Sequence, residues 1–221
     1  MIDRGYWITE DVLSPSECEK LAVALCDGGK PRGRAGARHL MATPEVAALA
    51  SDRRLLCIAA AALRGHTVPY RATLFEKSGR ANWLVVWHQD TALPLLSHVP
   101  SSEWGPWSTK AGVLYAHAPT WALERIIALR VHLDASTSEN GPLRVIPGSH
   151  RHGVVSDEEV FQMARDRESV ECVVSRGGIL AMRPLLVHSS PKVRLAEPRR
   201  VLHLEYADGL ELAQGVRLAV A

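Results

Sequence analysis

The chain has 221 residues, of which 47% are hydrophobic and 23% charged, and its formal net charge at pH 7 is +2. A chain of this length buries about 70% of the surface of its unfolded state, so it can form a globular domain without cross-links. The small net charge and the dispersed basic residues give no support for nucleic acid or an anionic membrane as a partner, and no apolar run approaches the ~20 residues that span a bilayer.

The cysteines Cys18, Cys26, Cys57 and Cys172 are widely spaced and form no CxxC pair. Such spacing is unusual for a disulfide framework in a chain of this size, so we expect reduced cysteines in a cytoplasmic protein. The opening residues, MIDRGYWITED, are acidic and aromatic and lack the features of a secretory signal peptide. The oligomeric state is not indicated by any of these features.

Helical signals dominate the first third of the chain. Ser14 is followed by Pro at the first helical position and by Glu17 three residues on, which is a capping-box pattern. Leu21 and Leu25, with Cys18, then mark an apolar face at helical spacing. We therefore predict a helix that begins after Ser14 and packs through this face.

A predicted loop and a second helical stretch follow. Residues 30–39 are rich in Gly and Arg, a composition typical of loops. The TPE motif at Thr43 opens the helical stretch, which we expect to break near residues 51–52 and to end at Gly65. The apolar spacing in these helices indicates packing rather than a cofactor site.

From residue 68 the pattern changes to short runs typical of β-strands, punctuated by Gly, Pro and Ser. These runs are residues 69–77, 82–90, 125–134, 143–150, 170–182, 185–190 and 199–209. Ser156, with Glu159 three residues on, predicts one more helix over residues 157–167. We therefore expect one mainly β domain over residues 1–221, with a jelly-roll core at about 68–210 and the N-terminal helices packed outside it.

The run WLVVWHQD, which ends at Asp90, indicates a buried strand that finishes in His-Gln-Asp. Period-two alternation puts His88 and Asp90 on one face. The same face carries Leu84 and Val86, and the other face is also apolar, so we expect both faces to be covered. A carboxylate beside an imidazole at such a place costs free energy unless something compensates it. A His–Asp hydrogen bond at a strand end is one explanation, and metal ligation is the other.

Metal ligation needs a third ligand, and His188 in the run RPLLVHSS also comes at the end of an apolar stretch. Two histidines and one carboxylate make the facial triad of non-haem Fe(II) oxygenases. Such a triad leaves open positions on the iron for a chelating 2-oxoacid and for O2.

An anion-binding partner for this triad is available in Arg199, because a planar guanidinium can hold a carboxylate bidentately. The distal carboxylate of 2-oxoglutarate would suit it. Arg200 points to the opposite face of the same predicted strand, so only one of the two can serve. A charge exposed at a strand edge is the alternative interpretation of Arg199.

Together these segments resemble the phytanoyl-CoA dioxygenase family of iron(II)/2-oxoglutarate oxygenases, in particular its bacterial small-molecule members. The resemblance covers roughly residues 70–206 and rests on WHQD, ENGPLRVIPGSHRHG, RPLLVHSS and PRRVLHLEY. It implies a double-stranded β-helix, a cupin-like jelly roll. It also implies Fe(II) as cofactor, 2-oxoglutarate and O2 as co-substrates, and oxidation of a small molecule with release of succinate and CO2.

The resemblance also assigns residues. The family's iron ligands map onto His88, Asp90 and His188, and its co-substrate arginine maps onto Arg199. Related halogenases replace the metal carboxylate with a small residue. Because Asp90 is present, the resemblance favours hydroxylation over halogenation.

Further co-substrate contacts follow from the same comparison. Ser190 occupies the place of a serine that often touches 2-oxoglutarate, and Thr73 that of a residue directed toward the co-substrate. Arg130 departs from the family, which often has an aromatic residue there. It could bind 2-oxoglutarate, bind a substrate anion, or pair with Asp134 for structural reasons.

Two other segments attract attention. Residues 97–121 are long, irregular and rich in aromatic residues, and we interpret them as a lid over the iron, with a dimer contact or a packed rim as the alternative. His150 and His152 are also two residues apart, but the Pro and Gly residues around them indicate a turn with a structural role.

Two rival functions remain open. One is a non-redox, cupin-like metalloenzyme that uses the same ligands, which Arg199 and Ser190 disfavour because such chemistry needs no 2-oxoglutarate anchor. The other is a ligand-binding protein that keeps the pocket without turnover. The substrate is not identified, although Arg130, Lys110 or Arg71 would suit an anionic small molecule.

Overall fold

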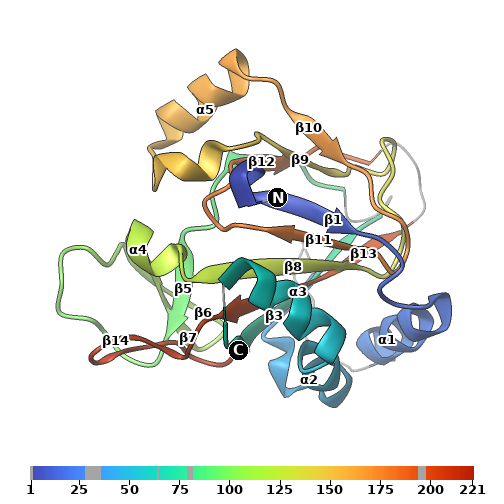
Figure 1. Ribbon diagram of the computed structural model, residues 1–221, viewed down its shortest axis with the longest axis horizontal. Helices are drawn as coiled ribbons and strands as arrows, with labels where there is room; N and C mark the ends of the chain where they lie inside the picture. The colour runs from blue at the N-terminus through green and yellow to red at the C-terminus, as the bar shows by residue number, and fades with distance from the viewer. Residues whose placement is uncertain (1, 28–35, 64, 79–81, 194–197) are drawn as a thin grey trace.

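The computed structural model describes residues 2–27, 36–63, 65–78, 82–193 and 198–221 (Figure 1). Its α-helices are α1 (Pro15–Asp27), α2 (Pro44–Ala50), α3 (Arg53–Leu63), α4 (Thr120–Leu123) and α5 (Asp157–Asp166). Short 3-10 helices are η1 (Ile2–Arg4), η2 (Leu40–Ala42) and η3 (Ser149–His152). The strands are β1 (Tyr6–Thr9), β2 (Gly36–Arg38), β3 (Val68–Lys77), β4 (Val85–His88), β5 (Ala92–Leu95), β6 (Trp107–Lys110), β7 (Val113–His117), β8 (Ile126–His132), β9 (Leu143–Val145), β10 (Val170–Cys172), β11 (Ile179–Met182), β12 (His188–Ser190), β13 (Arg199–Ala207), β14 (Glu211–Ala213) and β15 (Val216–Arg217).

Two antiparallel sheets pack together as a jelly roll, which confirms the predicted fold class. The larger sheet has the order β1-β11-β8-β13-β3-β2, and the smaller one has the order β10-β9-β12-β4. Val145 of the smaller sheet packs in one buried cluster with Leu180 and Met182 of the larger. A third sheet, β5-β7-β6, and the hairpin β14-β15 extend the roll at one end (Figure 1).

The N-terminal helices cover the outer face of the larger sheet, as expected (Figure 1). Leu55 of α3 and Leu49 of α2 share a buried cluster with Leu129 of β8. Most predicted boundaries of these helices are confirmed, including the break between α2 and α3. The capping box at the start of α5 is also confirmed, since Ser156 Oγ accepts from the backbone N–H of Glu159.

The predicted loop over residues 30–39 is wrong in part. Residues 30–35 lie outside the described residues, but Gly36–Arg38 form strand β2, which pairs with β3. Gly36 has φ +126°, and a Cβ there would lie 1.9 Å from the carbonyl oxygen of Leu74. The glycine that suggested a loop therefore permits a close approach of two strands.

The predicted irregular lid is also wrong in part, because much of residues 97–121 is regular. Strands β6 and β7 form a hairpin there, which pairs with β5 through β7. Trp104 is buried in a core cluster and meets Trp121 edge to face. This segment therefore packs as a rim of the roll. Among the described helices, none is long and apolar enough to cross a membrane.

Candidate metal and co-substrate site

His88, Asp90 and His188 converge at the end of the smaller sheet. One ligand atom from each lies within 4.8 Å of the others. The Nε2 atoms of His88 and His188 lie 3.7 and 3.5 Å from the carboxylate oxygens of Asp90. The two histidines face each other directly as register partners of β4 and β12. Two distant segments of the chain thus present two imidazoles and one carboxylate to a common point.

The strand that carries His88 is irregular, and this overturns the expected alternation. The ladder also pairs Ser190 with Val85, so β4 has one more residue than β12 between these two rungs. Such a β-bulge re-aims side chains. As a result, Val85 and His88 both line the site cavity, whereas Leu84 and Val86 are 56% and 54% exposed. The expectation that both faces of this strand are covered was therefore wrong.

Each histidine is held in one tautomer by its own strand. The Nδ1 atoms of His88 and His188 lie 2.8 Å from the backbone carbonyl oxygens of Val86 and Leu186. A carbonyl oxygen can only accept a hydrogen bond, so Nδ1 carries the proton. The lone pair of Nε2 is then free to bind a metal ion, which is the usual arrangement of a metal-ligating histidine.

The charges of the three groups suit a metal site. Burial lowers the pKa of His188 to about 4, so this imidazole is neutral. Burial alone would raise the pKa of Asp90, but the two histidines outweigh it and hold that pKa well below its ordinary value. Burial also acts to lower the pKa of His88, but Asp90 and the backbone hydrogen bonds of Val86 and His188 together raise this pKa above its ordinary value. The site therefore keeps a charged carboxylate beside at least one neutral imidazole.

Gln89, between the two ligands of the His-Gln-Asp motif, ties them to the rest of the roll. Its side-chain amide donates to the carbonyl oxygens of Gly153 and Leu185, at 2.9 and 2.8 Å, and accepts from the backbone N–H of Val155 at 3.1 Å. Ser149 Oγ accepts from the backbone N–H of the residue before His188, at 2.8 Å. The segment NGPLRVIPGSHRHG therefore supports both histidine-bearing strands.

A cavity adjoins the three ligands, and Arg199 lines it. This side chain is buried, and its Nη1 donates to Ser136 Oγ at 3.3 Å. Its Nε is buried and has no hydrogen-bond partner among the described residues. Arg200 faces away and forms an ion pair with Asp134 at 2.7 Å. The opposite orientation of the two arginines is what alternation along β13 predicted.

Arg130 lines the same cavity. Its Nη1 lies 3.2 Å from Nδ1 of His203, and its guanidinium lies 5.3 Å from the centre of the Phe75 ring. Its Nε is buried without a hydrogen-bond partner in the described part of the chain. Because Asp134 pairs with Arg200, the interpretation that Arg130 pairs with Asp134 is wrong.

Lys77 is a third cation of this cavity, and the sequence reasoning missed it. It is paired directly with Arg199 in the ladder of β3 and β13. Its buried Nζ donates to Ser190 Oγ at 2.7 Å and to the carbonyl oxygen of Pro191 at 2.6 Å. The signal was alternation along β3, which puts Lys77 on the same face as Thr73. Thr73 itself is buried and is not among the residues that line the cavity.

Three cations in one small cavity perturb one another. Burial, and then Arg199 and Arg130, lower the pKa of Lys77 to about 7. Burial and the charge of Arg130 lower the pKa of Arg199 to about 9. Burial lowers the pKa of Arg130 to about 10, although Asp90 opposes this shift. Asp90 is the one carboxylate among the described lining residues, so the cavity carries an excess of positive charge.

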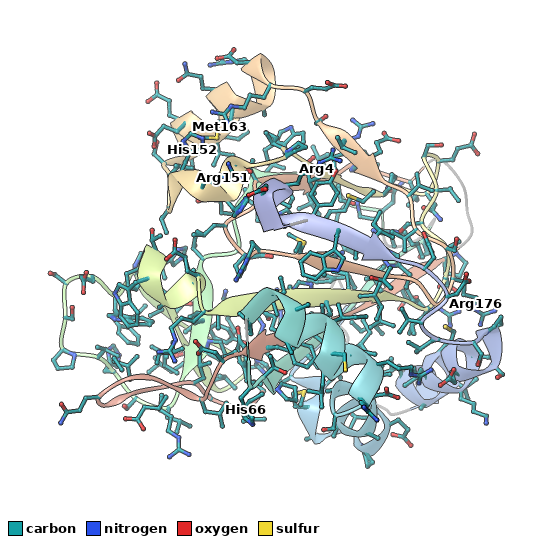
Figure 2. The ribbon with its side chains drawn as sticks, viewed as in Figure 1. Arg4, His66, Arg151, His152, Met163 and Arg176 are labelled. Atoms are coloured by element: carbon teal, nitrogen blue, oxygen red, sulfur yellow. The ribbon has the colours of Figure 1, made fainter. Side chains whose placement is uncertain are left out.

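The second histidine pair has no part in this site. His152, labelled in Figure 2, is exposed, and its Nε2 is 3.1 Å from Nη2 of Arg167. His150 belongs to the same short helix η3 and lies against Gly5. Both positions agree with the structural role expected for this turn.

Solved structures of the same fold include metal- and 2-oxoglutarate-bound proteins. The chain is similar to EctD from S. alaskensis with bound Fe, at 25% identity and a TM-score of 0.66 over 99% of this chain and 84% of that one. It is similar to HygX from Streptomyces hygroscopicus with nickel and 2-oxoglutarate, at 18% identity and a TM-score of 0.65 over 93% and 84%. It is also similar to SnoK, an α-ketoglutarate-dependent carbocyclase, at 17% identity and a TM-score of 0.70 over 94% and 81%.

One protein-family model matches most of the chain, whereas no curated protein sequence matches the chain. The family model described as phytanoyl-CoA dioxygenase matches residues 2–201, a span that contains the three candidate metal ligands and all three cavity cations. The resemblance drawn from the sequence motifs is thereby confirmed, and the chain belongs to the phytanoyl-CoA dioxygenase family.

Proposed function

We propose that the protein is an Fe(II)- and 2-oxoglutarate-dependent dioxygenase that hydroxylates a small molecule and releases succinate and CO2. The observation that carries this proposal is the pairing of two features in one cavity. A two-histidine, one-carboxylate set stands beside a cluster of buried cations that have unsatisfied donors. A metal and a dicarboxylate together account for both features.

The metal would be held by His88, Asp90 and His188. Imidazole and carboxylate ligands on one face, with open positions opposite, are typical of Fe(II) oxygenases. The backbone carbonyls that fix both histidine tautomers orient the Nε2 lone pairs toward that face. EctD, which shares the fold, has been crystallised with bound Fe.

The co-substrate would be held by the cavity cations. Arg199 offers an unsatisfied buried donor to the distal carboxylate of 2-oxoglutarate, and Lys77 and Ser190 stand beside it. Arg130 supplies a second unsatisfied donor in the same cavity. Burying a cation costs free energy unless it is paired, so a bound dianion would offset the cost of burying these three cations together.

Iron with 2-oxoglutarate and O2 supplies the oxidising equivalents for this chemistry, while the chain holds and orients the reactants. Phe75, Trp83 and Leu143 give the cavity apolar walls, which help to exclude water from the reacting groups. Asp90 occupies the carboxylate position that halogenases leave open, which favours hydroxylation. SnoK, described as a carbocyclase, is a member of the same fold with a different outcome.

One of the two rivals fits the cavity less well, and the other differs only in having no turnover. A non-redox metalloenzyme would need the three ligands but has no use for three buried cations beside them. A binding protein without turnover would keep both features, so only a measured product separates it from an oxygenase.

The test is spectroscopic and then chemical. Anaerobic addition of Fe(II) and 2-oxoglutarate should give a weak visible charge-transfer band, and air should then release succinate. His188→Ala should lose the band, whereas His152→Ala, a histidine outside the site, should keep it. A wild-type protein with no band would overturn the proposal, and a band without succinate under any condition would favour the binding protein.

A further inference from the structure

A second group of cations lies within electrostatic range of Asp90 but does not line the co-substrate cavity. It surrounds Tyr115 of β7. The ammonium of Lys110 lies 4.8 Å from the centre of the Tyr115 ring, and the guanidinium of Arg71 lies 5.5 Å from it. His39 Nε2 is 2.9 Å from the Tyr115 hydroxyl, and the two rings are stacked. Arg38 precedes His39 at the end of β2. We call Arg38, Arg71 and Lys110 the outer cation group.

This group is joined to the metal ligands by short connections. Arg71 Nη1 donates to the carbonyl oxygen of Ala92, two residues after Asp90, at 3.1 Å. Ala92 begins β5, and β5 pairs with the strand that carries Tyr115. The charge of Asp90 acts on the pKa values of both Arg71 and Lys110, although burial is the largest influence on each. The outer cation group therefore borders the triad.

The co-substrate cannot account for the outer cation group. Arg71 and Lys77 lie on the same face of β3, six residues apart. At about 3.3 Å per residue, that separation is about 20 Å, which exceeds the span of a five-carbon dicarboxylate. A 2-oxoglutarate anchored at Lys77 and Arg199 would leave the outer cations untouched.

Arg71 and Lys110 of this group are partly buried, whereas Arg38 is exposed to solvent. Arg71 forms a buried ion pair with Glu205 at 2.6 Å, so its charge is matched. Neither Lys110 nor Arg38 has a carboxylate partner in the part of the chain that the structure describes. Burial, and then the charges of Arg38 and Arg71, lower the pKa of Lys110. Lys110 is half-buried against an aromatic ring, unlike an ordinary surface lysine in free solvent.

We propose that the substrate of this enzyme is a small anion, with a carboxylate or phosphate group that binds Lys110 and Arg38 against the face of Tyr115. The proposal rests on the proposed function and names the substrate class for the same site. Arg71, fixed by Glu205 and Ala92, would border the anion, and the rest of the substrate would extend toward the triad. The anion would relieve repulsion between cations that no side chain of the described residues neutralises.

Lys110→Met is the variant of choice, because it removes the charge and keeps the length of the side chain without leaving a carboxylate unpaired. Arg71→Met is unsuitable, since it would leave Glu205 buried alone. Lys20→Met is the matched control, because Lys20 is an exposed lysine on α1. The probe is inorganic sulfate, titrated calorimetrically at low ionic strength into protein loaded with Ni(II) and saturating 2-oxoglutarate, so that the co-substrate cavity is filled.

Sulfate should bind the loaded wild type and the Lys20→Met variant alike, and should bind Lys110→Met about tenfold more weakly. Lys110→Met should keep the wild-type affinity for 2-oxoglutarate. No sulfate binding to the wild type, or equal binding to both variants, overturns the proposal. A second arm compares matched pairs of small carboxylic acids and their primary amides as stimulators of succinate release. The acids should be preferred, and Lys110→Met should raise their KM more than it lowers kcat, whereas a preference for amides overturns the proposal.

The outcomes separate this proposal from the proposed function. If the anaerobic Fe(II)–2-oxoglutarate band is absent, the enzyme assignment has failed. If the band is present and Lys110 is irrelevant to sulfate and to the acids, only the substrate class is wrong.

Discussion

Arg199 and Arg200 are neighbours on β13 with opposite surroundings, and replacing each with alanine tests the co-substrate site directly. Arg199 is 2% exposed and has an unsatisfied Nε in the cavity. A charge-assisted hydrogen bond contributes about 1.5–3 kcal/mol, and about 1.4 kcal/mol is a factor of ten in affinity. Arg199→Ala should therefore raise the dissociation constant of 2-oxoglutarate about tenfold to a hundredfold. Arg200→Ala should change it by less than about twofold, because Arg200 faces Asp134 instead of the cavity.

The assay is an anaerobic titration of 2-oxoglutarate at saturating Fe(II), followed by the charge-transfer absorbance. Thermal unfolding of the ligand-free proteins adds a second measurement, in which Arg200→Ala should have the larger effect. Arg199→Ala removes a buried cation that Arg130 repels, so it should not lower the melting temperature. Arg200→Ala removes an ion pair whose side chains are only 18% and 20% exposed and leaves Asp134 without this partner, so it should lower the melting temperature by a few degrees. A larger loss of 2-oxoglutarate affinity in Arg200→Ala than in Arg199→Ala would refute the assigned register.

Three further predictions follow from the site and from β2. Asp90→Ala should abolish succinate release, and Asp90→Gly should allow at best weak halide binding; full activity in Asp90→Ala would place the carboxylate ligand elsewhere. The pKa of Lys77 is lowered to about 7, so above that pH the free enzyme must take up a proton to bind the dianion. The affinity of the wild type for 2-oxoglutarate should then fall up to about tenfold per pH unit. Lys77→Met should bind 2-oxoglutarate more weakly, with an affinity that depends less on pH. A wild-type affinity that does not change between pH 6 and pH 8.5 would contradict this. Gly36→Ala should destabilise the protein by more than about 1 kcal/mol, read as a melting temperature lower by several degrees, because its Cβ would meet Leu74 O, whereas Gly209→Ala should have little effect.

The candidate metal ligands could be predicted because their signal is local. His88 and Asp90 stand together in the sequence, and each of the two histidines follows an apolar run that has to be a strand. The cavity side of Arg199 could also be predicted, since alternation along an uninterrupted strand fixes which of two neighbours points inward. The structure places these side chains together as the motifs indicated.

What could not be predicted depends on contacts between strands. Lys77 carries no motif, and only the register of β3 with β13 brings it opposite Arg199. The bulge in β4 breaks the alternation on which the sequence reasoning relied, because an extra residue in one strand has no local signature. The network from Arg71 through Glu205 is invisible for the same reason. The register between neighbouring strands determines which ionic side chains meet, and spacing along the chain does not reveal that register.

The bulge in β4 separates the side that His88 faces from the ordinary alternation of the strand before it. In a regular strand, two residues that are three apart face opposite sides, so without the extra residue Val85 and His88 could not both line the cavity. Removing that residue would leave Val85 and His88 two apart, and a straight ladder with β12 would still set His88 opposite His188. Descendants of this chain can therefore lose one residue from β4 and keep the metal ligand, whereas the same deletion inside a regular strand would turn every residue on one side of it to the opposite face.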